Sequence, residues 1–227
     1  MDQCASLARG DIEPAECGRL SVADSLVSLA ADIRACRVCV ENTAAGRRLP
    51  HRPRPVVVPS ATARILIAGQ APGTMVHATG LPFNDASGDC LRAWLGVSRD
   101  EFYDPEKFAI VPMGFCFPGQ DAKGGDLPPR RECAPAWRSR LLALMPQIEL
   151  VLAIGLYAHS WHLGPLRRAS LTQTVMDWRE IHGATSVPKV LPLPHPSWRN
   201  SGWIKKNPWF ETELLPFLRS EISSRIT

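Results

Sequence analysis

Short apolar runs set the strongest constraint on how this 227-residue chain folds. Residues 64–69 have the sequence Arg-Ile-Leu-Ile-Ala-Gly, and residues 150–155 have the sequence Leu-Val-Leu-Ala-Ile-Gly. Runs of this length and composition are typical of strands that are buried on both faces of a parallel sheet. Residues 108–111 and 190–193 form two similar runs. Pro192 in the second predicts an edge strand or a strand end, because proline cannot donate a ladder hydrogen bond.

Helical segments lie between and around these runs. The sequence predicts helices at residues 22–35, 89–95, 132–145, 157–163 and 208–222. Alternating strands and helices predict an α/β fold, a three-layer α/β/α domain with a central, mostly parallel four-stranded sheet. We expect residues 21–227 to form this single domain, and residues 1–20, which show no periodicity, to be loosely ordered.

The composition narrows the class of protein. Hydrophobic residues make up 45% and charged residues 21% of the chain, which is ordinary for a globular protein. No run of eighteen apolar residues occurs, and the N-terminus lacks the basic and apolar regions of a secretory signal. We therefore expect a cytoplasmic protein whose seven cysteines are not a disulfide framework. The net charge of +4 permits a polyanionic partner without requiring one.

Three loops follow the predicted strands and carry polar or turn-forming residues. Residues 69–73 (Gly-Gln-Ala-Pro-Gly) follow the first strand, residues 112–118 follow the second, and residues 194–200 (Pro-His-Pro-Ser-Trp-Arg-Asn) follow the fourth. Ligands of open parallel sheets bind beyond the carboxyl ends of the strands. We therefore expect these three loops to converge on one crevice.

Four cysteines form a candidate metal constellation. Cys36 and Cys39 make a C-x2-C pair, and Cys116 and Cys133 make a C-x16-C pair. A C-x2-C turn can direct two thiolates at one metal centre, and a second pair can complete a shell of four. The spacing alone leaves three interpretations open: a zinc site, an iron–sulfur cluster, or four small residues buried in a core.

Together the motifs resemble the uracil-DNA glycosylase superfamily, most closely its iron–sulfur branch, families 4 and 5. The matching segments, which agree in order and spacing over about residues 25–222, are Cys36-x2-Cys39, residues 69–73, residues 80–83 (Gly-Leu-Pro-Phe), Cys116-x16-Cys133 and residues 195–197 (His-Pro-Ser). The resemblance implies a structural [4Fe–4S] cluster on the four cysteines. It also implies a DNA repair glycosylase that hydrolyses the N-glycosidic bond of uracil, and of related deaminated bases, to leave an abasic site.

Base excision needs an extruded nucleotide, a stabilised sugar cation and a stabilised base anion. The resemblance places His195 at the base carbonyl as a hydrogen-bond donor and Phe83 against the base. Family 4 has a glutamate in the first loop where this chain has Gln70, so residues 69–73 contain no carboxylate. A family 5 segment matches Asp85 after a one-residue deletion, so we expect Asp85 to orient or deprotonate water. Gln70 and Asn84 would position the water or the base.

Each of these residues also has a plain structural interpretation. Asp85 is suited to a helix cap or an Asx turn, His195 to packing in a proline-rich turn, and Phe83 to the core. The resemblance further assigns substrate binding to Gly69, Ala71, Pro72, Ser197, Trp198 and Arg199. Trp198 or Arg199 would enter the minor groove and fill the gap left by the flipped base.

One departure from the family pattern concerns base selection. Family 4 has an asparagine four residues before the third cysteine, where its amide recognises uracil, and this chain has Pro112 there. Proline has no side-chain donor, so we expect looser discrimination among bases. We expect a monomer that acts on DNA. Two alternatives are a glycosylase-fold protein that binds uracil-containing or abasic DNA without turnover, and a zinc-stabilised nucleic-acid protein without base chemistry.

Overall fold

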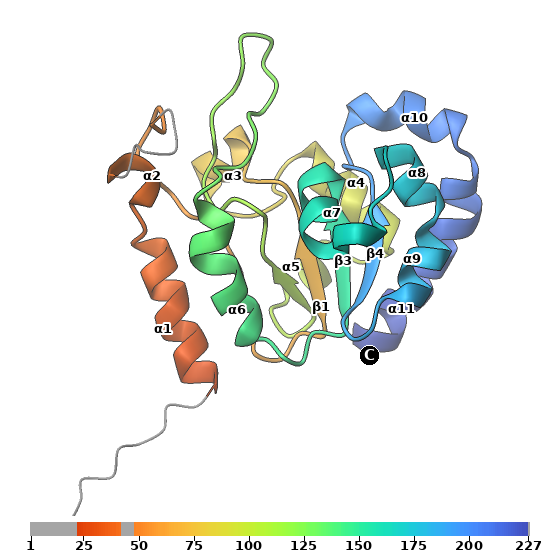
Figure 1. Ribbon diagram of the computed structural model, residues 1–227, viewed down its shortest axis with the longest axis horizontal. Coiled ribbons are helices and arrows are strands. Elements are labelled where there is room, and N and C mark those ends of the chain that lie inside the picture. Colours follow the sequence, from red (N-terminus) through yellow and green to blue (C-terminus); the bar gives the residue numbers. More distant parts are fainter. Residues whose placement is uncertain (1–21, 42–47, 227) are drawn as a thin grey trace, which may run out of the picture.

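A parallel sheet forms the centre of the computed structural model, which describes residues 22–41 and 48–226 (Figure 1). The predicted loose segment, residues 1–20, lies outside these described residues. All strand pairs are parallel, in the order β2-β1-β3-β4. The strands are β1 (Ile65–Ala68), β2 (Phe108–Ile110), β3 (Leu150–Ile154) and β4 (Lys189–Leu193). The four apolar runs therefore form the strands, and β4, with Pro192, lies at a sheet edge as predicted.

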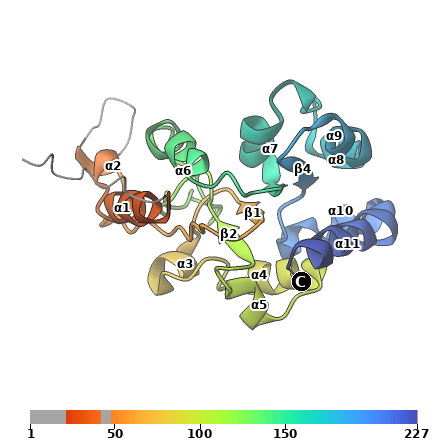
Figure 2. The same ribbon diagram turned by 90° about the horizontal axis from the view of Figure 1, so that it is seen from below.

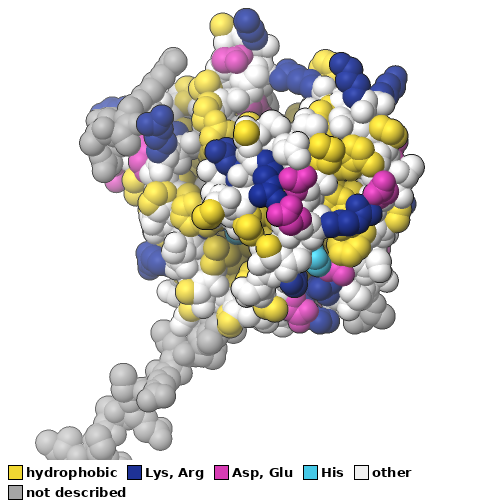
Figure 3. Space-filling model, turned by 45° about the vertical axis from the view of Figure 1, so that its right-hand side comes forward, with side chains coloured by type: hydrophobic (Ala, Val, Ile, Leu, Met, Phe, Trp, Pro, Cys, Tyr) yellow, Lys and Arg dark blue, Asp and Glu magenta, His cyan; other side chains and the backbone are white. Residues whose placement is uncertain are grey.

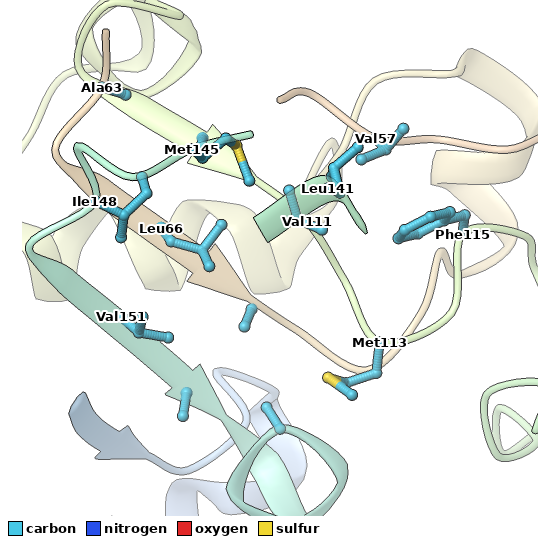
Figure 4. Packing of buried hydrophobic residues seen from close by; sticks show 14 of the residues in the cluster. Val57, Ala63, Leu66, Val111, Met113, Phe115, Leu141, Met145, Ile148 and Val151 are labelled. Carbon is cyan, nitrogen blue, oxygen red and sulfur yellow. The ribbon is translucent and has the colours of Figure 1, made fainter. Parts of the chain in front are cut away.

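Side chains at alternate strand positions enter two separate apolar cores. In β1, Leu66 and Ala68 belong to the first core, whereas Ile65 and Ile67 belong to the second. Figure 4 shows part of the first core, in which Leu141 of the helix after β2 packs over the sheet. Because both faces are covered, every position of these strands favours an apolar residue, which explains the continuous runs in the sequence.

Helices cover both faces of the sheet, which confirms the predicted three-layer α/β/α fold (Figures 1 and 2). The α-helices that pack on the first core include α1 (Val22–Arg34), α6 (Ser139–Ala143) and α7 (Gly155–Leu163). Those on the second core are α4 (Ala86–Leu95), α5 (Arg99–Tyr103) and α11 (Leu215–Ile226). The other α-helices are α2 (Val38–Glu41), α3 (Thr74–Thr79), α8 (Leu171–Met176), α9 (Trp178–Ala184) and α10 (Ser201–Lys206). Each helix in the described residues is too short or too polar to cross a membrane.

Some helix boundaries differ from the predicted ones. The helix predicted at residues 132–145 is a π-helical turn (Ala134–Arg138) followed by α6, and Pro135 removes a backbone donor at its start. The helix predicted at residues 208–222 likewise begins with a π-helical turn (Phe210–Leu214) before α11. Two short 3₁₀ turns complete the helical elements, at Gly164–Leu166 and Trp198–Asn200.

The sequence does not predict α8 and α9, which lie beside β4. Val175 and Trp178 of this helix pair enter the second core, whereas Ile181 enters the first. A pair of short helices that serves both cores has no single apolar face. Its sequence therefore lacks the periodicity that marks a longer surface helix.

His159 gives the fold a predictable response to acid. Its ring is fully buried in α7, and Nε2 lies 3.0 Å from the Ala153 carbonyl oxygen and 3.1 Å from that of Leu193. Burial lowers the pKa of His159 from 6.5 to about 4, so the unfolded chain binds a proton first as the pH falls.

We expect the free energy of unfolding to be highest above about pH 6.5 and to fall as the pH drops toward 4, with His159 contributing about 3 kcal/mol of the loss. Urea denaturation at a series of pH values measures this decline. The His159→Gln variant should be less stable at pH 7 but should show a shallower decline. An equal slope in both proteins would contradict the assignment to His159.

Candidate active site

A pocket lies beyond the carboxyl ends of the strands. The loop after β1 lines it with Gly69, Gln70, Ala71, Pro72 and Gly73. Pro112 comes from the loop after β2, and His195 comes from the loop after β4. The predicted convergence of these three loops on one crevice is therefore confirmed.

Phe83 forms one wall of the pocket in a strained backbone conformation. Its φ of 53° lies in the left-handed region, which bulky residues rarely adopt. The Phe83 carbonyl oxygen accepts hydrogen bonds from Tyr103 Oη (3.2 Å) and Arg92 Nη1 (3.4 Å). A Cβ at Gly69 would lie 3.2 Å from Phe83 Cζ, so the ring lies directly against the first loop. These contacts hold the strained backbone in place and keep the Phe83 ring at the pocket.

Asp85 both caps a helix and lines the pocket. Its Oδ1 accepts hydrogen bonds from Ser87 Oγ at 2.5 Å and from the Gly88 amide at 3.1 Å. This cap starts α4 at Ala86, three residues before the predicted start. The helix-cap interpretation of Asp85 therefore describes its bonding, while its carboxylate also belongs to the pocket lining.

His195 is held at the pocket by hydrogen bonds to its own main chain. Its carbonyl oxygen accepts hydrogen bonds from Asn200 Nδ2 at 2.7 Å and from the Ser197 amide at 2.8 Å. Burial lowers the pKa of His195, and the carboxylates of Asp85 and Asp126 oppose this effect. The imidazole is therefore neutral at neutral pH, with one N–H as a donor.

Gln70 joins the first loop to a hairpin that lies between Cys116 and Cys133 and carries Asp126. Gln70 Nε2 donates to the Leu127 carbonyl oxygen at 3.2 Å. Asp126, on the same hairpin, lines the pocket although the sequence did not mark it as a site residue. Its only sequence signal is a Gly-Gly-Asp segment in the long loop between Cys116 and Cys133, which is no recognised motif.

Four of the predicted substrate-binding residues lie outside the pocket lining. Asn84 faces α5, and its Oδ1 accepts a hydrogen bond from Arg99 Nη2 at 2.9 Å. Ser197 Oγ accepts from the Arg199 amide at 3.1 Å and caps the 3₁₀ turn after it. Trp198 is 78% exposed, and the Arg199 guanidinium lies 5.8 Å from its ring centroid. Trp198 and Arg199 are therefore surface groups beside the pocket.

The four cysteines of the two motif pairs line a second cavity. Trp137 Nε1 donates to Cys36 Sγ at 3.3 Å, and the Phe115 amide donates to Cys133 Sγ at 3.3 Å. Burial raises the pKa of the Cys116 and Cys133 thiols to about 12, so a cation is needed to hold them as thiolates.

The donor set bears on which metal group this cavity could hold. Within residues 22–41 and 48–226, no group of three or more His, Cys, Asp or Glu side chains could hold one metal ion. A single zinc ion requires its sulfur ligands about 2.3 Å from one point, whereas an iron–sulfur cluster holds each sulfur on a different iron. Four thiols line one cavity, and two of them accept N–H hydrogen bonds, so the donor set suits an iron–sulfur cluster.

Residues 55–219 match the family described as the Uracil DNA glycosylase superfamily. The chain belongs to this superfamily. The matched segment contains the whole sheet, the pocket and the cysteines Cys116 and Cys133, whereas Cys36 and Cys39 precede it. Superfamily membership indicates a glycosylase-type activity on DNA.

Gly88 offers a test of how Phe83 is held. A Cβ at Gly88 would lie 1.8 Å from the Phe83 carbonyl oxygen, so alanine there must displace the loop. We expect Gly88→Ala to lower the free energy of unfolding by about 2 kcal/mol or more, although alanine normally stabilises a helix. Urea denaturation measures the change. Gly183→Ala, in α9 with open space around it, is the matched control and should be neutral or stabilising. Equal effects of the two substitutions would contradict the proposed contact.

Proposed function

We propose that the chain is a monomeric DNA glycosylase that hydrolyses the N-glycosidic bond of uracil and of related deaminated bases in DNA. One observation carries the proposal: Phe83, Asp85 and His195 line a single pocket in a chain of the uracil DNA glycosylase superfamily. An aromatic face, a carboxylate and a neutral imidazole are the groups that base excision needs. The product is an abasic site.

The pocket suits a flat base that has left the DNA stack. Phe83, Ile110 and Pro112 give it apolar walls, and the Phe83 ring offers a surface for the extruded base. Pro112 supplies no side-chain donor for reading the edge of the base. Discrimination then rests on backbone groups and on the shape of the pocket, which favours a range of deaminated bases.

Asp85 and His195 have different tasks in the reaction. Asp85 orients a water molecule and accepts its proton as the water oxygen bonds to the sugar C1′. The bond from C1′ to the base nitrogen breaks, and its electron pair leaves with the base. The neutral His195 imidazole donates a hydrogen bond to the base carbonyl, where negative charge develops. Gln70 uses Nε2 to hold the hairpin, and we assign the positioning of water to its Oε1.

The surface around the pocket suits a polyanion. Figure 3 shows Lys and Arg side chains along the upper edge of the molecule, over α10 and on the protruding hairpin. Lys205 and Lys206 end α10, and the exposed Trp198 stands just before this helix. Lysine and arginine side chains neutralise phosphates, while an aromatic side chain can fill the gap left by a flipped base. We assign these tasks to the lysines and to Trp198 with Arg199.

The cysteine cavity completes the proposal. Cys36, Cys39, Cys116 and Cys133 would hold a [4Fe–4S] cluster, which supplies a structural link rather than redox chemistry. Cys36 and Cys39 lie near the N-terminal helices, whereas Cys116 and Cys133 lie at the two ends of the loop that carries the hairpin. A bound cluster would therefore fasten α1 and α2 to this loop.

Base release from a panel of oligonucleotides, each with one altered base, tests the function. The proposal expects release of uracil and of at least one other deaminated base, followed by strand cleavage in alkali. The first loop contains no carboxylate, which favours one alternative: a protein that binds such DNA without turnover. Binding in a gel without any base release would support that alternative and contradict the proposal.

Asp85→Asn separates the chemical from the structural role of this residue. Asparagine is as good a helix cap as aspartate, so α4 keeps its start while the carboxylate is lost. We expect the single-turnover rate of base release to fall by roughly 10²-fold or more. Asp100→Asn, which changes an exposed carboxylate on α5, is the control and should leave the rate unchanged. An unchanged rate in Asp85→Asn would remove Asp85 from the mechanism.

Cys36→Ser tests the cysteine ligands. We expect the purified variant to contain less iron and to unfold at a lower temperature than the wild type, because one thiolate of the shell is lost. Iron analysis and visible absorbance measure the first effect, and calorimetry measures the second. Cys90→Ser, a cysteine on α4 away from the cavity, should retain full iron. Full iron in Cys36→Ser, or stoichiometric zinc in the wild type, would overturn the cluster assignment.

A further inference from the structure

The hairpin between Cys116 and Cys133 has a defined shape of its own. Gln120 and Asp126 pair across it in an antiparallel bridge, and the Leu127 amide donates to the Gly119 carbonyl oxygen at 2.9 Å. At the tip, Asp121 Oδ1 accepts hydrogen bonds from the amides of Lys123 and Gly125, each at 2.8 Å. Figure 1 shows this hairpin rising above the carboxyl edge of the sheet. A hydrogen-bonded turn therefore sets the position of Asp126.

The foot of the hairpin is joined to the loop after β1. The Met113 amide donates to the Gly69 carbonyl oxygen at 2.8 Å, and the Gly114 amide donates to that of Gln70 at 2.9 Å. Further along, the Gln70 side chain reaches the Leu127 carbonyl oxygen at 3.2 Å. These bonds hold the hairpin against the first loop and bring its returning strand over the pocket.

Asp126 presents one carboxylate oxygen to the first loop. Its Oδ1 accepts a hydrogen bond from Gln120 Nε2 at 3.2 Å, whereas Oδ2 would lie 3.3 Å from a Cβ at Gly73. The Asp126 carboxylate also acts on the His195 ring, because it raises the pKa that burial lowers. Asp126 thus lies beside the first loop, which has no carboxylate, and shares the pocket with Asp85 and His195.

The depth of the groups in the pocket suggests different tasks for the two acids. Phe83 and Ile110 form the apolar interior, whereas Asp126 is exposed to solvent at the mouth. An extruded nucleotide places its base inside such a pocket and leaves its sugar at the mouth. The sugar carries the positive charge in the oxocarbenium-like transition state, and a nearby carboxylate stabilises that charge.

We propose that Asp126 is a second catalytic carboxylate, supplied by the hairpin, which stabilises the cationic sugar in place of an acid in the first loop. The inference rests on the proposed glycosylase function. In the reaction, water forms a bond to C1′, and the bond from C1′ to the base breaks with its electron pair on the base. The water proton passes to Asp85 and then to solvent. Asp126 keeps its charge throughout and transfers no proton.

The test compares Asp126→Asn with the wild type and with Asp121→Asn. Asparagine at position 126 keeps an oxygen for Gln120 and loses only the charge. Asp121→Asn is the matched control, because it removes a carboxylate from the same hairpin outside the pocket lining and keeps an oxygen for the turn. Two quantities are measured: the single-turnover rate of uracil release, and affinity for an oligonucleotide with an abasic-site analogue.

We expect Asp126→Asn to lower the rate by about 10²-fold while affinity changes by less than about 3-fold, and Asp121→Asn to resemble the wild type. A rate within about 3-fold of the wild type would overturn the role of Asp126 and leave the proposed function standing. Equal losses of rate and affinity would also overturn it, because Asp126 would then only shape the hairpin. No base release by the wild type across the panel would overturn both proposals.

Discussion

Parallel pairing of β1 with strands on both sides is the constraint on which the rest of the molecule depends. From β1 the chain crosses to β2 through α4 and α5 on the second core, then returns past β1 to β3 through α6 on the first core. Right-handed crossovers require this change of face when the direction reverses. The reversal opens a crevice at the carboxyl end of β1, and residues 69–73 line it.

A buried arginine connects the two cavities of the protein. Arg138 is fully buried and donates through Nη1 to the carbonyl oxygens of Val111 (2.9 Å) and Pro112 (2.8 Å). Its Nη2 lies 2.6 Å from His162 Nε2, and burial lowers the pKa of that imidazole to about 3, so the ring is a neutral acceptor. Arg138 follows Cys133 by five residues. Arg138 therefore links the main chain at Pro112, which lines the pocket, to the helical turn that follows Cys133.

Much of the fold could be predicted from the sequence, because burial on both faces leaves a strong local signal. The runs that became β1 and β3 needed no tertiary information, and the order of the loops followed from the rules for parallel sheets. Phe83 and His195 were found through motif order, and the structure places both at the pocket. The short helices α8 and α9 were missed because their apolar residues serve two cores.

The remaining site residues depend on contacts that no local pattern records. Asp85 and Asn84 are neighbours, yet one lines the pocket and the other is held by Arg99. Asp126 reaches the pocket on a hairpin that Gln70 and the Gln120 bridge hold, and the contact of Gln70 with Leu127 joins residues 57 positions apart in the chain. Contacts between two loops fix the position of such a residue. They leave no periodicity or spacing in the sequence, so a single sequence does not reveal it.

At Phe83, the groups that fix the left-handed backbone differ from the side chain that lines the pocket. The path of this loop is imposed by groups that touch its main chain: Gly88, whose missing side chain lets the Phe83 carbonyl approach closely, and the donors Tyr103 and Arg92. The ring packs against Phe102 and presents a face to the pocket. A different side chain at position 83 would therefore alter which molecules the pocket admits without removing the groups that set the path of the loop.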